Sequence, residues 1–294
     1  MKVRIGIGIA GAHAPDDLEG LCRALLDHRF DSIWIPEILT QPGLDPMVAL
    51  AWLSGRLPAL KVGTTFLLPK RNVLRLARQL ATLDQLSGGR LLLTGVPGLA
   101  KGPESVAVGA LPSTRGALID ESLPLLKRLL DGEATDVPSD AGVARSVVLD
   151  PPSRQRPLEI WLGGMVPSSL DRCGRLGDGW LPAMCTPAQA AAGRRRIEEV
   201  AAEAGRAIDP EHYGVSIGYA AAPLDDGVRR ALQARAKTDD LSNIVPQSLE
   251  GLHDLLCAYL EVGFSKFVVR PLIAPTSWGH ELEELAEAVG ALQN

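Results

Sequence analysis

The sequence predicts an α/β protein of the (β/α)8 TIM-barrel class, with residues 1–294 forming a single domain. Short apolar runs alternate with amphipathic helical segments eight times along the chain, as in such barrels. No Pro- or Ser-rich linker marks a domain boundary. A doubly wound open sheet is disfavoured, because Gly6, Gly8 and Gly11 do not form the GxGxxG fingerprint expected after its first strand.

The first four βα units follow from the periodicity of apolar residues. The expected strands are Val3–Ile9, Ser32–Ile35, Lys61–Leu68 and Leu91–Val96. The expected helices are Asp16–His28, Asp45–Leu57, Val73–Leu86 and Arg115–Leu130. In the first helix, Leu18, Leu21 and Leu25 recur at helical spacing. Residues 97–111 are expected to form a loop between the fourth strand and its helix.

The last four units are less regular, and two insertions interrupt the repeat. The expected strands are Leu158–Leu162, Trp180–Leu181, Tyr213–Ala221 and Lys266–Arg270. The expected helices are Ser168–Leu176, Pro187–Glu203, Ser248–Val262 and Ser277–Leu292. Insertions follow the fourth and seventh βα units, at about 131–156 and 223–246. The first is rich in Asp, Pro and Gly, with a short strand at Ser146–Leu149, and the second contains a helical fragment around Val228–Lys237.

Charge and cysteine content restrict the classes of partner. A net charge of −5 and a pI near 5.6 argue against nucleic acid as the main partner. The four cysteines are scattered, and none forms a CxxC pair or another spacing typical of metal ligands. We therefore expect buried thiols and no metal site. Without a signal peptide or membrane span, the expectation is a cytoplasmic protein with a small-molecule substrate, assembled as a homodimer.

Gly163 and Gly164 lie between an expected strand and a helix that begins near Pro167. At such a junction, free N–H groups at the helix start can bind an anion, although a tight βα turn alone also explains the two glycines. A helix start contributes only about 0.3–1 kcal/mol to anion binding, and up to ~2 when partly buried. Micromolar affinity needs roughly 8 kcal/mol. Other loops must therefore supply most of the binding energy for a phosphorylated cofactor.

The expected carboxyl rim of the barrel carries few ionisable residues. His13 follows the first strand, Glu37 the second, and Arg270 ends the last. The sequence shows no paired carboxylates, no Ser-His-Asp pattern and no metal cluster. Such a rim favours a cofactor that carries the chemistry itself, and hydride transfer fits because the protein then needs only to position two ring systems and exclude water.

Three blocks of sequence resemble the luciferase-like monooxygenase superfamily. They are Pro157–Ala183 with its strand-GG-helix-RLGDGWLP pattern, Val62–Arg90 (VGTTFLLPKRNVLRLARQLATLDQLSGGR) and Gly263–Pro271 (GFSKFVVRP). Within that superfamily the chain resembles the F420-dependent oxidoreductases of actinobacteria. The resemblance implies an enzyme that transfers a hydride between coenzyme F420 and a small organic substrate. An FMN-dependent monooxygenase and a barrel that binds a flavin-like ligand without turnover are the alternatives.

The resemblance also implies which residues contact the cofactor. The residues expected to support the ring are Thr64, Thr65 and Phe66, with a non-prolyl cis peptide at Thr65–Phe66 or next to it. Those expected near the ring or its ribityl chain are Gly95, Val96 and Gly98, and those expected near the phosphate are Gly163, Gly164 and Met165. On this basis, Gly164→Val is expected to weaken coenzyme binding and leave the Tm nearly unchanged.

Several positions depart from the family pattern. Relatives that oxidise glucose 6-phosphate carry Asp-His after the second strand, where this chain has Glu37-Ile38. Leu99 stands near the position of a carboxylate in the fourth-strand loop, and Pro97 interrupts the usual GVGxG pattern. The alcohol-oxidising mechanism of those relatives therefore does not carry over.

His13 and Glu37 remain as catalytic candidates for proton transfer. A solvated carboxylate at the end of a strand is the plain alternative for Glu37. Arg270 either neutralises an anionic coenzyme or substrate or closes the rim of the barrel. Glu104 matches an acidic residue that recurs in the fourth-strand loop of the family.

Overall fold

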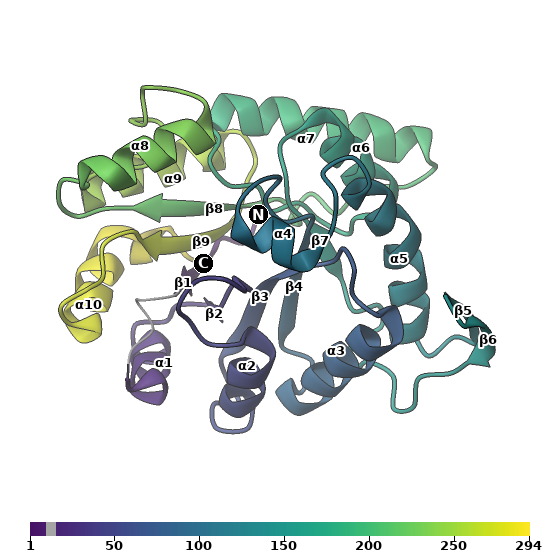
Figure 1. The fold of residues 1–294 in the computed structure, drawn as a ribbon. Coiled ribbons are helices and arrows are strands. Elements are labelled where there is room, and N and C mark those ends of the chain that lie inside the picture. The colour runs from purple at the N-terminus through teal and green to yellow at the C-terminus, as the bar shows by residue number, and fades with distance from the viewer. Residues whose placement is uncertain (10–15) are drawn as a thin grey trace.

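A curled parallel sheet of seven strands forms the centre of the computed structural model, which describes residues 1–9 and 16–294 (Figure 1). The strand order is β7-β4-β3-β2-β1-β9-β8. These strands are β1 (Arg4–Gly8), β2 (Ser32–Trp34), β3 (Lys61–Leu67), β4 (Leu91–Val96), β7 (Ile160–Leu162), β8 (Gly214–Tyr219) and β9 (Lys266–Pro271). All the pairings in this sheet are parallel, as the alternation of strands and helices in the sequence predicts.

Most helices surround the sheet on its outer side, whereas the short helix Pro103–Val108 lies in front of the middle of the sheet in this view (Figure 1). The helices are α1 (Leu18–Asp27), α2 (Pro46–Ser54), α3 (Val73–Ser87), α4 (Pro103–Val108), α5 (Arg115–Leu130), α6 (Pro167–Leu176), α7 (Pro187–Glu203), α8 (Asp226–Ala236), α9 (Leu249–Glu261) and α10 (Trp278–Val289). Side chains cap the amino ends of seven of them, including a capping box between Thr186 and Gln189 at α7. Helices α4, α5 and α6 lack a side-chain cap.

The segment Trp180–Ala183 joins the two edges of the sheet. Trp180 bridges Leu162 of β7 on one side and Tyr213 on the other, while Ala183 bridges Ser216 of β8. The sixth strand expected at Trp180–Leu181 is therefore present only as isolated bridges. Pro182 follows directly and has no N–H to donate, which limits the hydrogen-bond ladder.

The two expected insertions lie outside the parallel sheet. Residues 131–156 contain an antiparallel hairpin of β5 (Thr135–Ser139) and β6 (Gly142–Val147), so the expected strand at Ser146–Leu149 begins earlier and has a partner. Residues 223–246 contain α8. Residues 97–111 were expected to form only a loop, but they include α4. None of the residues of α4 is buried, so the helix has no apolar face that periodicity could reveal.

Side chains alternate between the two faces of each strand. The contacts of β3 identify the face toward the helices and the face toward the interior of the curled sheet. Phe66 is fully buried in the hydrophobic core between sheet and helices. A Cβ added at Gly63 would collide with the indole of Trp34, which lines a cavity inside the curled sheet. Val62, Thr64 and Phe66 therefore face the helices, while Gly63, Thr65 and Leu67 face the interior of the sheet.

The expected cis peptide in β3 is absent. Peptide bonds from Gly63 to Leu68 are trans, and the cis bonds in the described residues precede Pro151 and Pro157. The prediction is wrong because β3 contains no bulge: its register with β4 runs without interruption from Val62–Leu91 to Leu67–Val96. A regular parallel ladder leaves no place for a reversed peptide.

The cysteines are free thiols, and three of the four are buried. Burial raises the pKa of Cys22 and of Cys173 to about 12 and that of Cys185 to about 11. These thiols remain protonated at neutral pH and are poor nucleophiles. Across the described residues, no helix is both long enough and apolar enough to cross a membrane.

Candidate functional site

The carboxyl ends of β3 and β4 bring two threonines together on the inner face of the sheet. Thr65 pairs in register with Thr94, so their side chains lie next to each other on the same face. The hydroxyl of Thr94 is buried and has no hydrogen-bond partner among the described residues. An unpartnered buried hydroxyl is costly, and a ligand group in this position would satisfy it. Thr94 was not predicted, although it directly precedes the glycine of the predicted loop.

Three residues that were predicted to contact the cofactor lie on the outer face of the sheet, opposite to Thr65 and Thr94. Thr64 and Phe66 face the helices, and both are completely buried. Gly95 pairs with Phe66, and a Cβ added there would lie 2.5 Å from Cδ1 of Leu68, a core residue. Strand alternation directs the side chains of Thr64 and Phe66, and the Cα hydrogen of Gly95 that a Cβ would replace, away from the interior, so only the backbone of these residues could face a ligand there.

Val96 and Gly163 share the inner face with Thr94. A Cβ added at Gly163 would lie 2.8 Å from Cγ1 of Val96 and 3.4 Å from the carbonyl oxygen of Leu181. Gly98 has a positive φ of 74°, and the guanidinium of Arg115 donates to its carbonyl oxygen over 2.7 Å. The structure therefore brings Thr65, Val96 and Gly163 together around the inner end of β4.

The turn from β7 into α6 depends on Gly164. Its φ is +109°, and a Cβ there would lie 2.9 Å from Cβ and Oγ of Ser169. The indole N–H of Trp180 donates to the Gly164 carbonyl oxygen over 3.0 Å. Helix α6 begins at Pro167, which has no N–H, and the N–H groups of Ser169 and Leu170 donate to the carbonyl oxygen of Val166. In this first turn the N–H of Ser168 is left without a partner among the described residues and can donate to an anion. Met165 is only partly buried and packs against the core.

Replacing Gly164 by Ala is expected to lower the free energy of unfolding by about 1–3 kcal/mol, because the residue needs a left-handed backbone conformation beside Ser169. The expectation of a nearly unchanged Tm for Gly164→Val is thereby corrected. Gly102→Ala is the matched control, since φ is +108° there and a Cβ would meet nothing within 4 Å. Urea denaturation of both variants measures the difference. Equal losses would show that the contact with Ser169 contributes nothing.

Glu37 is a buried structural carboxylate. Its side chain is 3% exposed, accepts a hydrogen bond of 2.8 Å from the backbone N–H of Leu67, and forms an ion pair with Arg71. The alternative of a solvated strand-end carboxylate is therefore excluded. Glu37 ties the loop after β2 to the carboxyl end of β3. In a similar way, Glu104 of α4 accepts a hydrogen bond of 2.8 Å from the N–H of Leu39.

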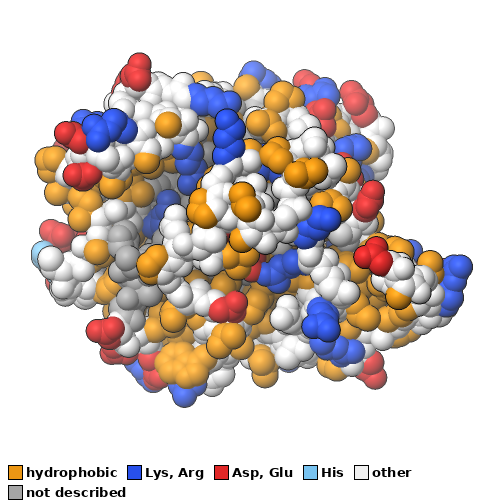
Figure 2. Space-filling model, in the orientation of Figure 1, with side chains coloured by type: hydrophobic (Ala, Val, Ile, Leu, Met, Phe, Trp, Pro, Cys, Tyr) orange, Lys and Arg blue, Asp and Glu red, His pale blue; other side chains and the backbone are white. Residues whose placement is uncertain are grey.

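Arg270 lies at the carboxyl end of β9, where its side chain crosses the inner side of Gly8. Its Nε is buried and has no hydrogen-bond partner among the described residues. Burial lowers the pKa of Arg270, and the positive charge of Arg235 on α8 lowers it further. Within the described part of the chain, Arg229, Arg235 and Arg270 form no salt bridge with a carboxylate. Lys and Arg side chains gather on the surface between α8 and α4 (Figure 2).

The remaining predictions concern His13 and metal binding. His13 lies outside the described residues. In residues 1–9 and 16–294, no group of three or more His, Cys, Asp or Glu side chains could hold a metal ion. The carboxyl edge of the sheet thus combines the Thr65–Thr94 pair, a helix start without a side-chain cap, and Arg270, which has no carboxylate partner among the described residues. These groups can bind an anion and position a flat ring.

The sequence matches the family model of the luciferase-like monooxygenases over residues 3–254. The chain belongs to the luciferase-like monooxygenase family. This match confirms the resemblance, and it covers two of the three sequence blocks, Val62–Arg90 and Pro157–Ala183. It also agrees with the curled parallel sheet and with the position of the site at the carboxyl ends of the strands.

Several solved structures share the luciferase-like fold over the whole chain. The F420-dependent tetrahydromethanopterin reductase from Methanopyrus kandleri has a TM-score of 0.77 at 17% identity, and 100% of each chain is covered. An F420-dependent secondary alcohol dehydrogenase, in complex with an F420-acetone adduct, has a TM-score of 0.80 at 17% identity, also with full coverage of both chains. A monooxygenase from Streptomyces bottropensis has a TM-score of 0.75 at 19% identity, with coverage of 98% of this chain and 99% of that chain.

Proposed function

We propose that this luciferase-like protein is an F420-dependent oxidoreductase that transfers a hydride between the deazaflavin and a small organic substrate. Membership of the family and the stated activities of the similar structures support an oxidoreductase. The observation that carries the proposal is the buried guanidinium Nε of Arg270, which has no partner among the described residues at the edge where such a barrel binds its ligands. An anionic coenzyme would compensate this charge.

Each part of the coenzyme has candidate partners in the chain. The N–H of Ser168 at the start of α6, together with Gly163 and Gly164, would hold its phosphate, because no side chain caps this helix. Thr65, Thr94 and Val96 would support one side of the ring. When bound, F420 supplies the hydride chemistry. The protein contributes orientation and exclusion of water, which agrees with a site that is poor in acids and bases.

Glu37 is assigned a positioning role in this proposal. Its carboxylate is occupied by the N–H of Leu67 and by Arg71. It therefore fixes the end of β3, two residues beyond Thr65, and does not itself donate a proton. His13 remains the candidate for proton transfer proposed from the sequence.

Binding of free coenzymes tests the proposal against an FMN-dependent monooxygenase. A monooxygenase is named both in the family description and for the Streptomyces bottropensis structure. Fluorescence of F420 and of FMN would be followed while the protein is added. We expect F420 to bind at least about tenfold more tightly, which corresponds to 1.4 kcal/mol. Tighter binding of FMN would support the monooxygenase, and binding of neither would contradict both functions.

Removal of the Thr94 hydroxyl is expected to weaken F420 binding about 2- to 10-fold, the effect of one hydrogen bond. The variant is Thr94→Val, which keeps the shape of the side chain. Thr64→Val is the matched control, because the Thr64 hydroxyl is also buried and without a partner among the described residues, but faces the helices. Calorimetric titration measures both. Equal affinities of the two variants would show that the ring does not contact Thr94.

A further inference from the structure

A cavity of ≈ 170 Å³ lies at the amino edge of the parallel sheet. Residues at the starts of strands line it, including Arg4 of β1, Lys61 of β3 and Lys266 of β9. Arg270 lies near the end of β9, and the start of α6 also lies at the opposite, carboxyl edge. The cavity is therefore separate from the site proposed for the coenzyme, and that proposal gives it no role.

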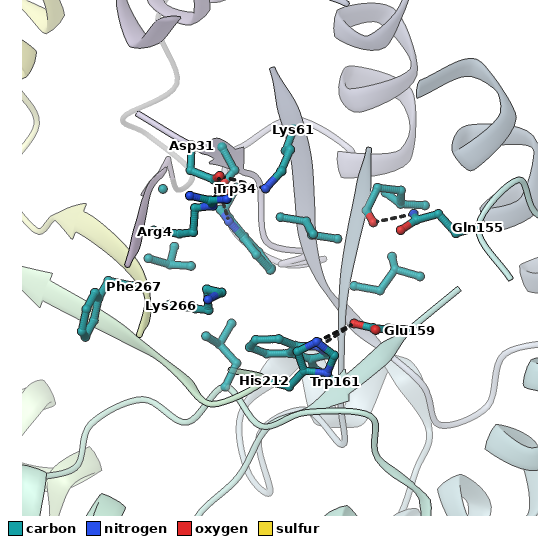
Figure 3. Close-up of a pocket in the computed structure, with 17 residues that line it drawn as sticks. Arg4, Asp31, Trp34, Lys61, Gln155, Glu159, Trp161, His212, Lys266 and Phe267 are labelled. Atoms are coloured by element: carbon teal, nitrogen blue, oxygen red, sulfur yellow. Dashed lines mark hydrogen bonds and ion pairs between the residues drawn. The ribbon is translucent and has the colours of Figure 1, made fainter. Parts of the chain in front are cut away.

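Two indole rings form walls of this cavity (Figure 3). A Cβ added at Gly63 would lie 2.4 Å from the ring of Trp34, and one added at Gly179 would lie 2.5 Å from the ring of Trp161. Branched aliphatic side chains usually fill the interior of such a barrel in layers. Here the glycines leave room for flat aromatic surfaces, and Leu92, which pairs with Gly63, adds an apolar contact. The cavity therefore suits a flat ring.

The cations around the cavity have carboxylate partners. Nε of Arg4 and Nζ of Lys61 both contact the same oxygen of Asp31, at 3.0 Å and 2.8 Å. Nζ of Lys266 lies 3.4 Å from a carboxylate oxygen of Glu211, and it also donates to a backbone carbonyl oxygen over 2.7 Å. Because each of these cations is paired, they do not select an anionic ligand.

Glu159 is the third carboxylate beside the cavity, so three cations and three carboxylates surround it. The charges therefore balance when His212, the neighbour of Glu159, is neutral (Figure 3). A ligand without net charge can enter such a cavity without disturbing the ion pairs around it.

Glu159 and His212 place two hydrogen-bond acceptors side by side on the wall. Nδ1 of His212 lies 3.0 Å from the carbonyl oxygen of Asp178. A carbonyl only accepts, so Nδ1 carries the hydrogen of the neutral ring and Nε2 is left as an acceptor. This Nε2 lies 3.6 Å from Oε2 of Glu159, to which Nε1 of Trp161 donates over 3.4 Å. An O–H group of a ligand would supply the donor between the two acceptors.

We propose that this cavity binds a small neutral phenol, with its ring against Trp34 and Trp161 and its hydroxyl group donating to Glu159. A cavity of about 150 Å³ can hold one benzene ring, so this volume accommodates a ring with one small substituent. An anion would meet cations that are already paired and would be repelled by Glu159. An aromatic hydrocarbon would leave the two acceptors without a donor. The proposal does not depend on the coenzyme assignment.

Calorimetric titration of the protein with phenol tests this site. We expect one phenol to bind per chain with a Kd of about 1 mM or below, and benzoate to bind at least about tenfold more weakly. Leu92→Phe and Val268→Phe each enlarge a side chain of the lining, and each is expected to weaken phenol binding at least about tenfold. Two such variants are needed in case one does not fold. Leu86→Phe is the matched control, because Leu86 is exposed on α3.

Replacement of Glu159 by Leu separates the hydrogen bond from the packing of the ring. The variant is expected to weaken phenol binding about tenfold and to leave toluene binding unchanged or tighter, because toluene has the same shape without the hydroxyl. The side chain of Glu159 is 42% exposed, so its replacement is expected to have little effect on the fold.

Phenol is also expected to bind equally well when F420 is present. The proposal is overturned by any of the following results. These are no saturation by roughly 20 mM phenol, tighter binding of benzoate than of phenol, unchanged phenol affinity in a folded cavity-filling variant, equal effects of Glu159→Leu on phenol and toluene, or displacement of phenol by the coenzyme.

Discussion

Replacement of Arg270 by Met is expected to weaken F420 binding roughly 10- to 100-fold. A hydrogen bond to a charged group contributes about 1.5–3 kcal/mol, and each 1.4 kcal/mol is a factor of ten in Kd. The guanidinium is half-buried, and its Nε is without a partner among the described residues, so an anionic ligand can form this interaction without breaking another at that atom. Titration followed by coenzyme fluorescence measures the change.

The stability of the coenzyme-free Arg270→Met variant distinguishes ligand binding from a purely structural role. A half-buried cation without a carboxylate partner among the described residues costs free energy, so its removal is expected to leave the free energy of unfolding unchanged or to raise it. Arg230→Gln is the control, because Arg230 is an exposed arginine on α8. Lower stability with unchanged coenzyme affinity would show that Arg270 only closes the rim.

Among substitutions in the candidate site, truncation of Glu37 is expected to lower the free energy of unfolding most. Glu37→Ala leaves Arg71 and the N–H of Leu67 without their buried partner, and breaking such a pair typically costs about 3–5 kcal/mol. Glu104→Ala is the matched control. It also removes an acceptor from a backbone N–H, but at an exposed contact, where about 0.5–1.5 kcal/mol is expected. Urea denaturation compares the two.

The conservative variant Glu37→Gln tests the positioning role directly. The amide oxygen can still accept from Leu67, so the fold and the coenzyme affinity are expected to be retained better than in Glu37→Ala. If Glu37 instead supplied a proton in the reaction, Glu37→Gln would abolish turnover while the stability and the coenzyme affinity stayed near those of the wild type.

Much of the fold could be predicted because it depends on local patterns. Apolar residues at helical spacing identified α1 and α3, and the apolar runs identified the main strands. Where this signal is weak, one helix was missed and one predicted strand is present only as isolated bridges. Helix α4 buries no residue, and the Trp180–Ala183 segment is too short and interrupted by Pro182 to form a regular strand. Tertiary contacts hold Trp180 in place, between Leu162 and Tyr213.

The candidate site was predicted only in part. The order of strands and turns in the sequence placed Thr65, Val96, Gly163 and Arg270 at the carboxyl edge. Which side chains of β3 and β4 face the interior depends on the register between the strands, and a shift of one residue reverses the face. Thr94 was therefore missed, and Thr64 and Phe66 were expected to support the ring although their side chains face the helices.

The sequence by itself determined the family, the alternation of strands and helices, and the edge of the sheet at which chemistry is expected. These follow from local composition and from motifs contiguous in the chain. Only the tertiary structure decided that Glu37 is a buried partner of Arg71 and that Trp34 and Trp161 face one cavity. Those residues are far apart in sequence, and their burial and charge balance arise only when the curled sheet brings them together.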